Sequence, residues 1–89
     1  PLAEAEILKI FSQKGKKQLI GGKVIFGSIK KNSRLKILRN NEEIGMGKVL
    51  NLKRQKQEIN ETKENEECGI MFESDVQINE GDRLIWQLK

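Results

Sequence analysis

The 89-residue chain contains no histidine, no tyrosine and only one cysteine, Cys68. Histidine is the usual acid-base residue near neutral pH and the commonest metal ligand, so its absence removes a Ser-His-Asp triad and most familiar metal sites. One cysteine cannot form an intramolecular disulfide or a zinc cluster. We therefore expect this chain to have no enzyme activity, no cofactor and no metal site.

Long apolar runs are also missing, so we expect neither a signal peptide nor a membrane span within these residues. A lone cysteine is typical of a reducing compartment. We expect a cytoplasmic protein, or one from an organellar stroma or matrix, that has no membrane partner. The length favours a single domain over residues 1–89 with one modest core, and the start at Pro1 favours a fragment of a longer protein.

Charge is distributed unevenly along the chain. Residues 1–56 contain 14 Lys or Arg and 4 Asp or Glu, whereas residues 57–89 contain 3 and 9. The net charge of +4 therefore combines a basic part of +10 with an acidic part of −6. A basic block of this kind suits a polyanionic partner, because each neutralised phosphate releases counterions. An ordinary solvated lysine-rich surface explains the same composition, and charge alone leaves both readings open.

Alternation of apolar and polar residues predicts an all-β fold. Ala5, Ile7 and Phe11 are expected on one inward face of a first strand. Five further strands are expected at residues 19–26, 34–39, 44–52, 68–72 and 83–88, separated by turns rich in Asn, Gly and Asp. Glycines inside the strand-like runs permit bulges and sharp coiling, and closure removes exposed edges. We therefore predict a small closed six-stranded β-barrel.

Residues 53–66 form the one stretch whose composition also suits a helix. It lacks Gly and Pro, but Ile59 is its only apolar residue. One apolar residue cannot form a buried stripe, so we expect an extended hairpin arm with Ile59 pointing inward.

Three cations, Lys53, Arg54 and Lys56, follow an apolar strand segment and are expected at its exposed end. Arg54 can bind a phosphate through two N–H groups and can stack on a base, while the lysines act as mobile charges. A second basic loop at residues 14–17 is expected to add only a supplementary electrostatic contact. Exposed cations of an ordinary surface remain an alternative for both clusters.

Glu67, Cys68 and Gly69 precede another apolar strand segment. Glycine allows a ligand to approach the backbone, Glu67 can accept hydrogen bonds, and Cys68 can line a pocket wall. A strand start whose Cys68 faces the core explains the same residues. Both interpretations remain open from composition alone.

The spacing of these segments is more specific than their composition. Leu-Lys-Arg-x-Lys at 52–56, Glu-Cys-Gly at 67–69 and Gly-Asp at 81–82 form a pattern that resembles the carboxyl-terminal domain of bacterial translation initiation factor 2. The resemblance covers essentially the whole chain. Further matching positions are Ala5, Phe11, Gly21, Gly27, Arg39, Gly47 and Ile78.

The resemblance implies a six-stranded barrel similar to domain II of translation elongation factors. It also implies that the chain binds the acceptor end of formylmethionyl initiator tRNA. Lys53, Arg54 and Lys56 would contact terminal phosphates and bases, and residues 67–69 would help to form the aminoacyl pocket. The family further implies a monomeric domain, contact with the ribosome through a multidomain parent protein, and GTP hydrolysis only in a domain outside this chain.

Two positions next to the implied pocket depart from the family pattern. Gly22 stands where the family commonly has a cysteine, and Gln55 replaces an aromatic residue between the cations. These departures motivate an alternative function, in which the barrel docks onto the ribosome or another initiation factor without specific tRNA recognition.

Overall fold

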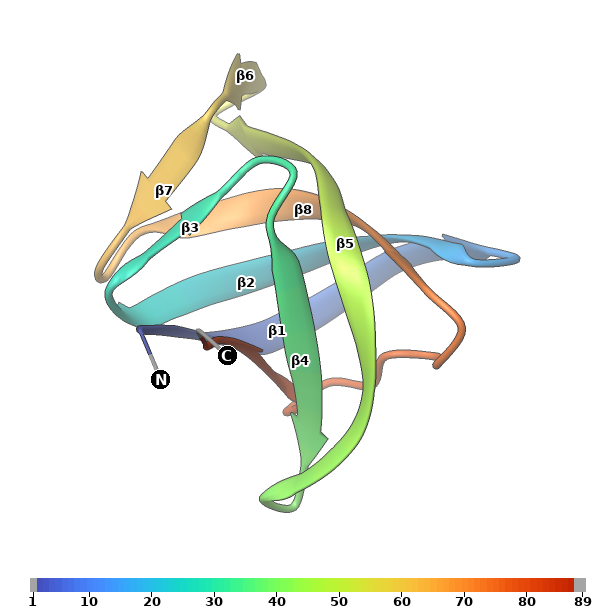
Figure 1. Ribbon diagram of the computed structural model, residues 1–89. Coiled ribbons are helices and arrows are strands. Elements are labelled where there is room, and N and C mark those ends of the chain that lie inside the picture. The colour runs from blue at the N-terminus through green and yellow to red at the C-terminus, as the bar shows by residue number, and fades with distance from the viewer. Residues whose placement is uncertain (1, 88–89) are drawn as a thin grey trace.

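The computed structural model describes residues 2–87, which form nine β-strands (Figure 1). The strands are β1 (Ala3–Lys14), β2 (Lys17–Phe26), β3 (Ser28–Lys30), β4 (Arg34–Arg39), β5 (Glu42–Arg54), β6 (Gln57–Ile59), β7 (Glu61–Lys63), β8 (Glu67–Ser74) and β9 (Arg83–Trp86). Five of the six predicted strands are found in full, as parts of β1, β2, β4, β5 and β8. The sixth is β9, although Leu88 of the predicted range lies outside the described residues.

Six of the strands close into an antiparallel barrel. They follow the order β4-β9-β1-β2-β8-β5, and β5 pairs back onto β4. β5 is long enough to serve two neighbours, because residues 42–48 pair with β4 and residues 47–53 pair with β8. The short β6 extends the sheet beyond β5, and β3 pairs with β7. The predicted closed six-stranded all-β barrel is confirmed.

The barrel interior is filled by aliphatic side chains and Phe72. Inward positions alternate along the strands, as in β8, where Cys68, Ile70 and Phe72 are buried and the residues between them are partly exposed. Each fully buried large apolar side chain contributes roughly 1.5–3 kcal/mol to folding. The largest buried apolar side chains are Phe72, Ile7, Ile20, Ile29, Leu35, Ile37, Leu52, Ile70, Ile78 and Leu84.

Phe11 is the exception to the predicted inward face of β1. Ala5 and Ile7 are buried, but 56% of Phe11 is exposed. The pairing of β1 with β2 is irregular between Ile7 and Lys9 and again between Ile10 and Ser12. Because each irregularity breaks the two-residue alternation, Phe11 turns outward and the prediction for this side chain is wrong.

The turns and the hairpin arm agree with the sequence. Asn32, Asn40 and Asn41 adopt positive φ angles of 72°, 53° and 66°, which Asn tolerates better than most residues. The arm returns after Arg54 through β6, and Ile59 packs against the core from a half-buried position. The prediction of a hairpin in place of a helix is confirmed.

An ion pair fastens the loop before β9 to the barrel. Arg39 donates from Nε and Nη2 to Asp82 at 3.0 and 2.9 Å, and the Asn79 amide donates to the same carboxylate at 2.9 Å. Burial disfavours the charged carboxylate, but these hydrogen bonds and the Arg39 charge outweigh it, so the pKa of Asp82 lies below its ordinary value.

We expect Asp82→Asn to destabilise the fold by about 1–3 kcal/mol at neutral pH, because one charge-assisted network is lost. Since the folded-state pKa is depressed, ionised Asp82 stabilises the protein above its unfolded pKa of 3.8, and this contribution disappears as the pH falls through the folded pKa. Urea unfolding between about pH 7 and pH 2 should therefore show a weaker acid dependence in the variant than in the wild type.

The matched control is Asp75→Asn, which removes an exposed ion pair with Lys16. It should leave the free energy of unfolding unchanged within error. Equal effects of the two substitutions would contradict the role of Asp82.

Gly47 supplies a second stability test. A Cβ at this position would overlap the Phe72 ring and lie 2.5 Å from the Glu73 carbonyl oxygen, so Gly47→Ala must displace β5 from β8. We expect a loss of about 1–3 kcal/mol in urea unfolding. Gly69→Ala is the control, because its Cβ would meet nothing closer than 3.8 Å. A Gly47→Ala protein as stable as Gly69→Ala would show that this close packing does not matter.

Candidate functional site

An open hollow of about 460 Å³ lies on the barrel surface where β1, β2, β8 and the end of β5 meet; we call it the glycine hollow. It brings together seven of the eight residues singled out in the sequence, and Lys56 is the one that does not line it. The lining residues are Leu8, Lys9, Phe11, Gly21, Gly22, Lys53, Arg54, Gln55, Glu67, Cys68 and Gly69.

The floor of the hollow is bare backbone. Gly21 of β2 pairs directly with Gly69 of β8, and both occupy outward positions of their strands. The same row continues to Lys9 on one side and to Lys53 on the other. The Phe11 ring lies over Gly21, so the backbone that a ligand can approach closely is at Gly69, with Lys53 at that edge and Lys9 at the other.

An apolar wall stands beside this floor. A Cβ on Gly21 would lie 3.1 Å from the Phe11 ring, so the ring covers the Gly21 edge of the floor. The Lys9 ammonium lies 5.4 Å from the centre of the same ring, within the range of a cation–π contact. Leu8 and Phe11 are 42% and 56% exposed. An exposed aromatic ring among cations is suited to stacking on a nucleic-acid base.

Sequence reasoning did not assign Leu8, Lys9 or Phe11 to the site. The available signal was the pair Ile7-Leu8, because two adjacent strand residues cannot both face the core. Ile10-Phe11 repeats this pattern. Each pair therefore indicates either an outward apolar residue or a bulge, and the structure contains both.

Arg54 is positioned by the Glu66 carboxylate. Its Nη1 donates to Glu66 Oε2 at 2.7 Å, while Glu66 Oε1 accepts the Lys63 backbone N–H at 2.8 Å. The Arg54 side chain is 45% exposed, so we assign this pair only about 0.2–1 kcal/mol. Glu66 thus orients the Arg54 guanidinium through a weak ion pair, and an anionic ligand can compete with Glu66 for the guanidinium.

Gln55 and Lys56 form the tight turn between β5 and β6. Both have positive φ angles, 52° and 67°, as a two-residue hairpin turn requires. Gln55 borders the glycine hollow, whereas Lys56 is exposed beyond its edge. Lys56 can therefore meet a long ligand that extends past the hollow, but not a small one confined to it.

Cys68 and Gly22 belong to the core side of the hollow. They face each other across β2 and β8, at inward positions. Cys68 is 8% exposed, and a Cβ at Gly22 would lie 3.2 Å from the Glu6 carbonyl oxygen and 3.3 Å from Ile70. A side chain at either position therefore points into the barrel, and the departure at Gly22 alters packing behind the floor and not the open face.

Residues 2–87 contain no group of three or more Cys, Asp or Glu that could hold a metal ion. No helix in that range is long and apolar enough to cross a membrane. The groups that the hollow itself presents are cations, the Glu67 carboxylate, exposed backbone and the apolar wall.

Comparison with known proteins identifies the family. The chain belongs to the family described as Elongation factor Tu domain 4, whose model matches residues 2–85. It is 39% identical over 83 residues to translation initiation factor IF-2 of Bartonella quintana (strain Toulouse) and 42% identical over 83 residues to the same factor of Rickettsia rickettsii (strain Sheila Smith). These matches cover 93% of this chain but only 10% of each relative. The predicted resemblance to initiation factor 2 is confirmed.

A solved structure supports the fold independently. The apo form of translation elongation factor SelB from Methanococcus maripaludis contains a similar barrel, with a TM-score of 0.77 and 24% sequence identity. The match covers 92% of this chain and 18% of the other. At this identity the likeness concerns the fold alone.

Burial raises the pKa of the Cys68 thiol, which gives a test of its inward orientation. We expect a thiol reagent at neutral pH to react with Cys68 at least about tenfold more slowly in the folded than in the unfolded chain. Because the thiolate is the nucleophile, the rate for the folded chain should continue to rise with pH beyond the pH at which the rate of a free thiol levels off. A folded-state rate equal to that of a free thiol would contradict the buried orientation.

Proposed function

We propose that this chain acts in translation initiation by binding the formylmethionyl acceptor end of initiator tRNA in the glycine hollow. Membership of the family and the IF-2 relatives support a role in translation initiation. The observation that carries the finer proposal is the Gly21–Gly69 floor, bordered by Lys9 and Lys53 and covered at one edge by Phe11.

Cations at the hollow supply the attraction for the RNA backbone. Lys9 and Lys53 stand at opposite edges of the floor, and Arg54 follows Lys53 at the end of β5. Arg54 can bind a phosphate through two N–H groups once the phosphate displaces Glu66 or shares the guanidinium with it. Lys56 contacts RNA that continues past the edge. These contacts are independent of base sequence and weaken as salt is added.

The apolar wall supplies recognition of the terminal nucleotide. Phe11 is exposed and lies over the edge of the floor, so a terminal base can stack on its ring. Such stacking contributes roughly 1–3 kcal/mol per base. Leu8 offers further apolar surface for the methionine side chain.

Charge accounts for selectivity toward the formylated amino acid. Unformylated methionyl-tRNA carries an ammonium group, which would enter a hollow lined by Lys9, Lys53 and Arg54. Glu66 already pairs with Arg54, so Lys9 and Lys53 still outnumber the one lining carboxylate, Glu67. Formylation removes that charge and leaves an amide N–H that Glu67 or the exposed floor can pair. The hollow therefore favours formylmethionyl-tRNA over methionyl-tRNA.

The proposed role is binding without catalysis. Nucleotide hydrolysis, contact with the ribosome and any further partners belong to parts of the protein outside this chain. We further propose that the domain works as a monomer in the cytoplasm or an equivalent organellar compartment.

A titration of the chain with formylmethionyl, methionyl and uncharged initiator tRNA tests the proposal. At about 50 mM salt we expect formylmethionyl-tRNA to bind at least about tenfold more tightly than either of the other forms, a difference of about 1.4 kcal/mol. All three affinities should fall at about 200 mM salt, because the phosphate contacts are shared. Equal affinity for formylated and uncharged tRNA would refute acyl recognition.

Two variants separate the floor from the cations. Gly69→Ala adds a methyl group to the open floor without a clash in the folded chain, so it should remove the preference for formylmethionyl-tRNA while leaving stability intact. Arg54→Ala should weaken binding of all three tRNAs and reduce the salt slope by about 1. A Gly69→Ala protein that keeps the wild-type preference would contradict the assignment of the floor.

A further inference from the structure

A second row of charges runs around the outside of the barrel, farther along the strands than the glycine hollow; we call it the distal row. Successive backbone pairings align one residue from each of five adjacent strands, β1, β2, β8, β5 and β4. Four of the five are cations and one is a carboxylate, which leaves a net charge of +3. In order across the barrel, the residues are Lys14, Lys17, Glu73, Lys48 and Arg34.

Arg34 and Lys48 form the strongest part of this row. They lie directly opposite each other on β4 and β5, and both are exposed. Within residues 2–87 neither takes part in an ion pair. Like charges opposite each other in a sheet destabilise it, so the pair costs stability unless an external anion binds there.

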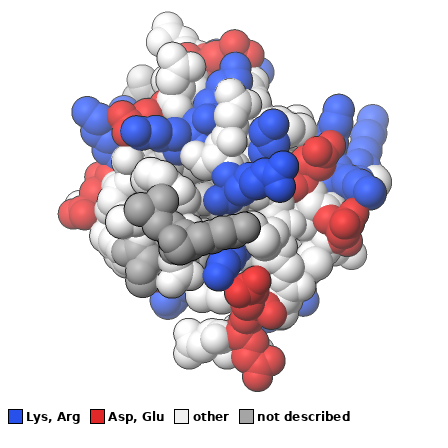
Figure 2. Space-filling model, viewed as in Figure 1, with Lys and Arg blue, Asp and Glu red and all other residues white. Residues whose placement is uncertain are grey.

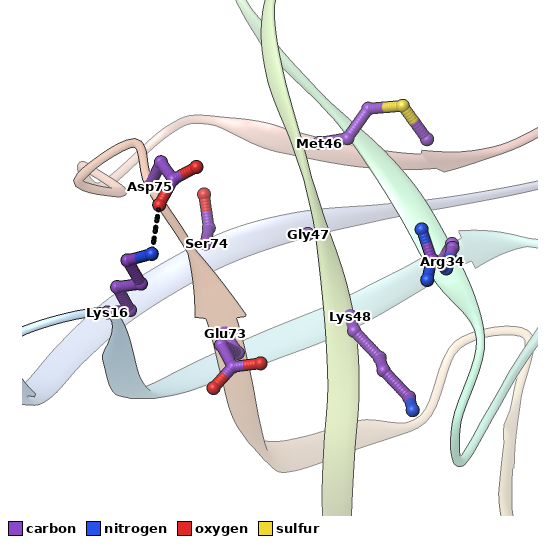
Figure 3. A pocket seen from close by; sticks show the side chains of 8 residues that line it. All are labelled: Lys16, Arg34, Met46, Gly47, Lys48, Glu73, Ser74 and Asp75. Atoms are coloured by element: carbon purple, nitrogen blue, oxygen red, sulfur yellow. Dashed lines mark ion pairs between the residues drawn. The ribbon is translucent and has the colours of Figure 1, made fainter.

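A hollow of about 280 Å³ opens between these cations and the end of β8. Figure 3 shows Arg34 and Lys48 on one side of it and the Lys16–Asp75 ion pair on the other. That pair, with 3.0 Å between Lys16 Nζ and Asp75 Oδ1, satisfies the Asp75 charge within the chain. Glu73 pairs in register with Lys17 and with Lys48, so it offsets part of their charge. Arg34, at the end of the row, has no carboxylate opposite it, and the row keeps its net charge of +3.

The distal row and the glycine hollow are in register with each other. Along β8, Glu73 lies four residues beyond Gly69, and along β2, Lys17 lies four residues before Gly21. At about 3.3 Å per residue the two rows are roughly 13 Å apart along the strands. The Arg34–Lys48 pair also lies two strand spacings, roughly 10 Å, to the side of the Gly21–Gly69 pair, so the two points are roughly 16 Å apart. A stacked nucleic-acid strand advances about 3.4 Å per nucleotide, so this separation corresponds to about five nucleotides.

The surface around this row is more suited to RNA than to a protein. In the view of Figure 2, Lys and Arg side chains lie over the middle of the face and at the edge where the β1–β2 hairpin projects, with acidic groups between them. The smaller hollow has charged or polar side chains around it, with Met46 as its only large apolar residue. A stable protein interface needs a larger apolar centre, whereas a phosphate backbone needs spaced cations.

We propose that Arg34 and Lys48 form a second phosphate-binding point, which holds the same RNA strand about five nucleotides upstream of the terminus seated in the glycine hollow. This inference rests on the proposed function. β5 then carries both contacts, Lys48 at one and Lys53 with Arg54 at the other, so the barrel fixes the direction in which the RNA leaves the hollow. Lys14 and Lys17 extend the row toward the hairpin tip.

The double variant Arg34→Ala/Lys48→Ala tests the inference with two ligands, formylmethionyl initiator tRNA and formylmethionyl-adenosine. The second ligand fills the glycine hollow but is too short to reach the distal row. We expect the variant to bind formylmethionyl-adenosine as the wild type does. For the tRNA, the association constant of the wild type falls as salt rises from about 50 to about 200 mM. Loss of two phosphate contacts should make that fall about sevenfold smaller in the variant than in the wild type.

The matched control is Lys30→Ala/Lys31→Ala, which removes the same charge from β3 and the turn after it, outside both hollows. A salt dependence equal to that of this control would overturn the second binding point. So would an equal loss of binding to formylmethionyl-adenosine, because it would mean that the substitutions disturb the glycine hollow. If wild-type chain shows no preference for the formylated ligand, the proposed function itself fails and the inference fails with it.

Discussion

The double pairing of β5 is the constraint on which the barrel and its functional face depend. One half of the strand pairs with β4 and the other with β8, and Gly47 and Lys48 are paired on both sides. Glycine at 47 permits this because a Cβ there would overlap Phe72. An irregularity between Val49 and Asn51 lets the strand coil from one neighbour to the next. Closure thereby places Lys48 and Lys53 on the outside of the barrel, with Arg54 at the end of β5 beside the glycine hollow.

Much of the barrel is predictable because burial imposes a strict alternation on its strands. Leu35 and Ile37 alternate with polar residues, and the predicted range 34–39 coincides with β4. Positive φ angles fall at Asn32, Asn40 and Asn41, where the sequence indicated turns. The three-residue strands β3 and β7 are too short to produce a period, so only their pairing across the fold reveals them. The irregular register of β1 likewise escapes a pattern that assumes regular alternation.

The candidate site is predictable from the sequence only in part. Its cations and the Glu-Cys-Gly segment are visible as local motifs, and the structure places most of them around one hollow. The floor was not predictable, because nothing local indicates that Gly21 faces Gly69 across two strands far apart in the sequence. The contact between Arg54 and Glu66 was missed for the same reason. The sequence did not decide whether the Cys68 side chain lines the pocket or faces the core. Strand alternation places it in the core behind the floor.

The central claim is that the bare floor and its flanking cations receive the acylated terminus of an RNA. The most direct measurement is chemical-shift mapping of the isotope-labelled chain during titration with formylmethionyl-adenosine. The account predicts saturable shifts centred on the amides of Gly21 and Gly69 and extending to Phe11, Lys53 and Arg54. Shifts confined to another face, or none at saturating ligand, would contradict it and would favour a barrel that docks onto a protein or the ribosome.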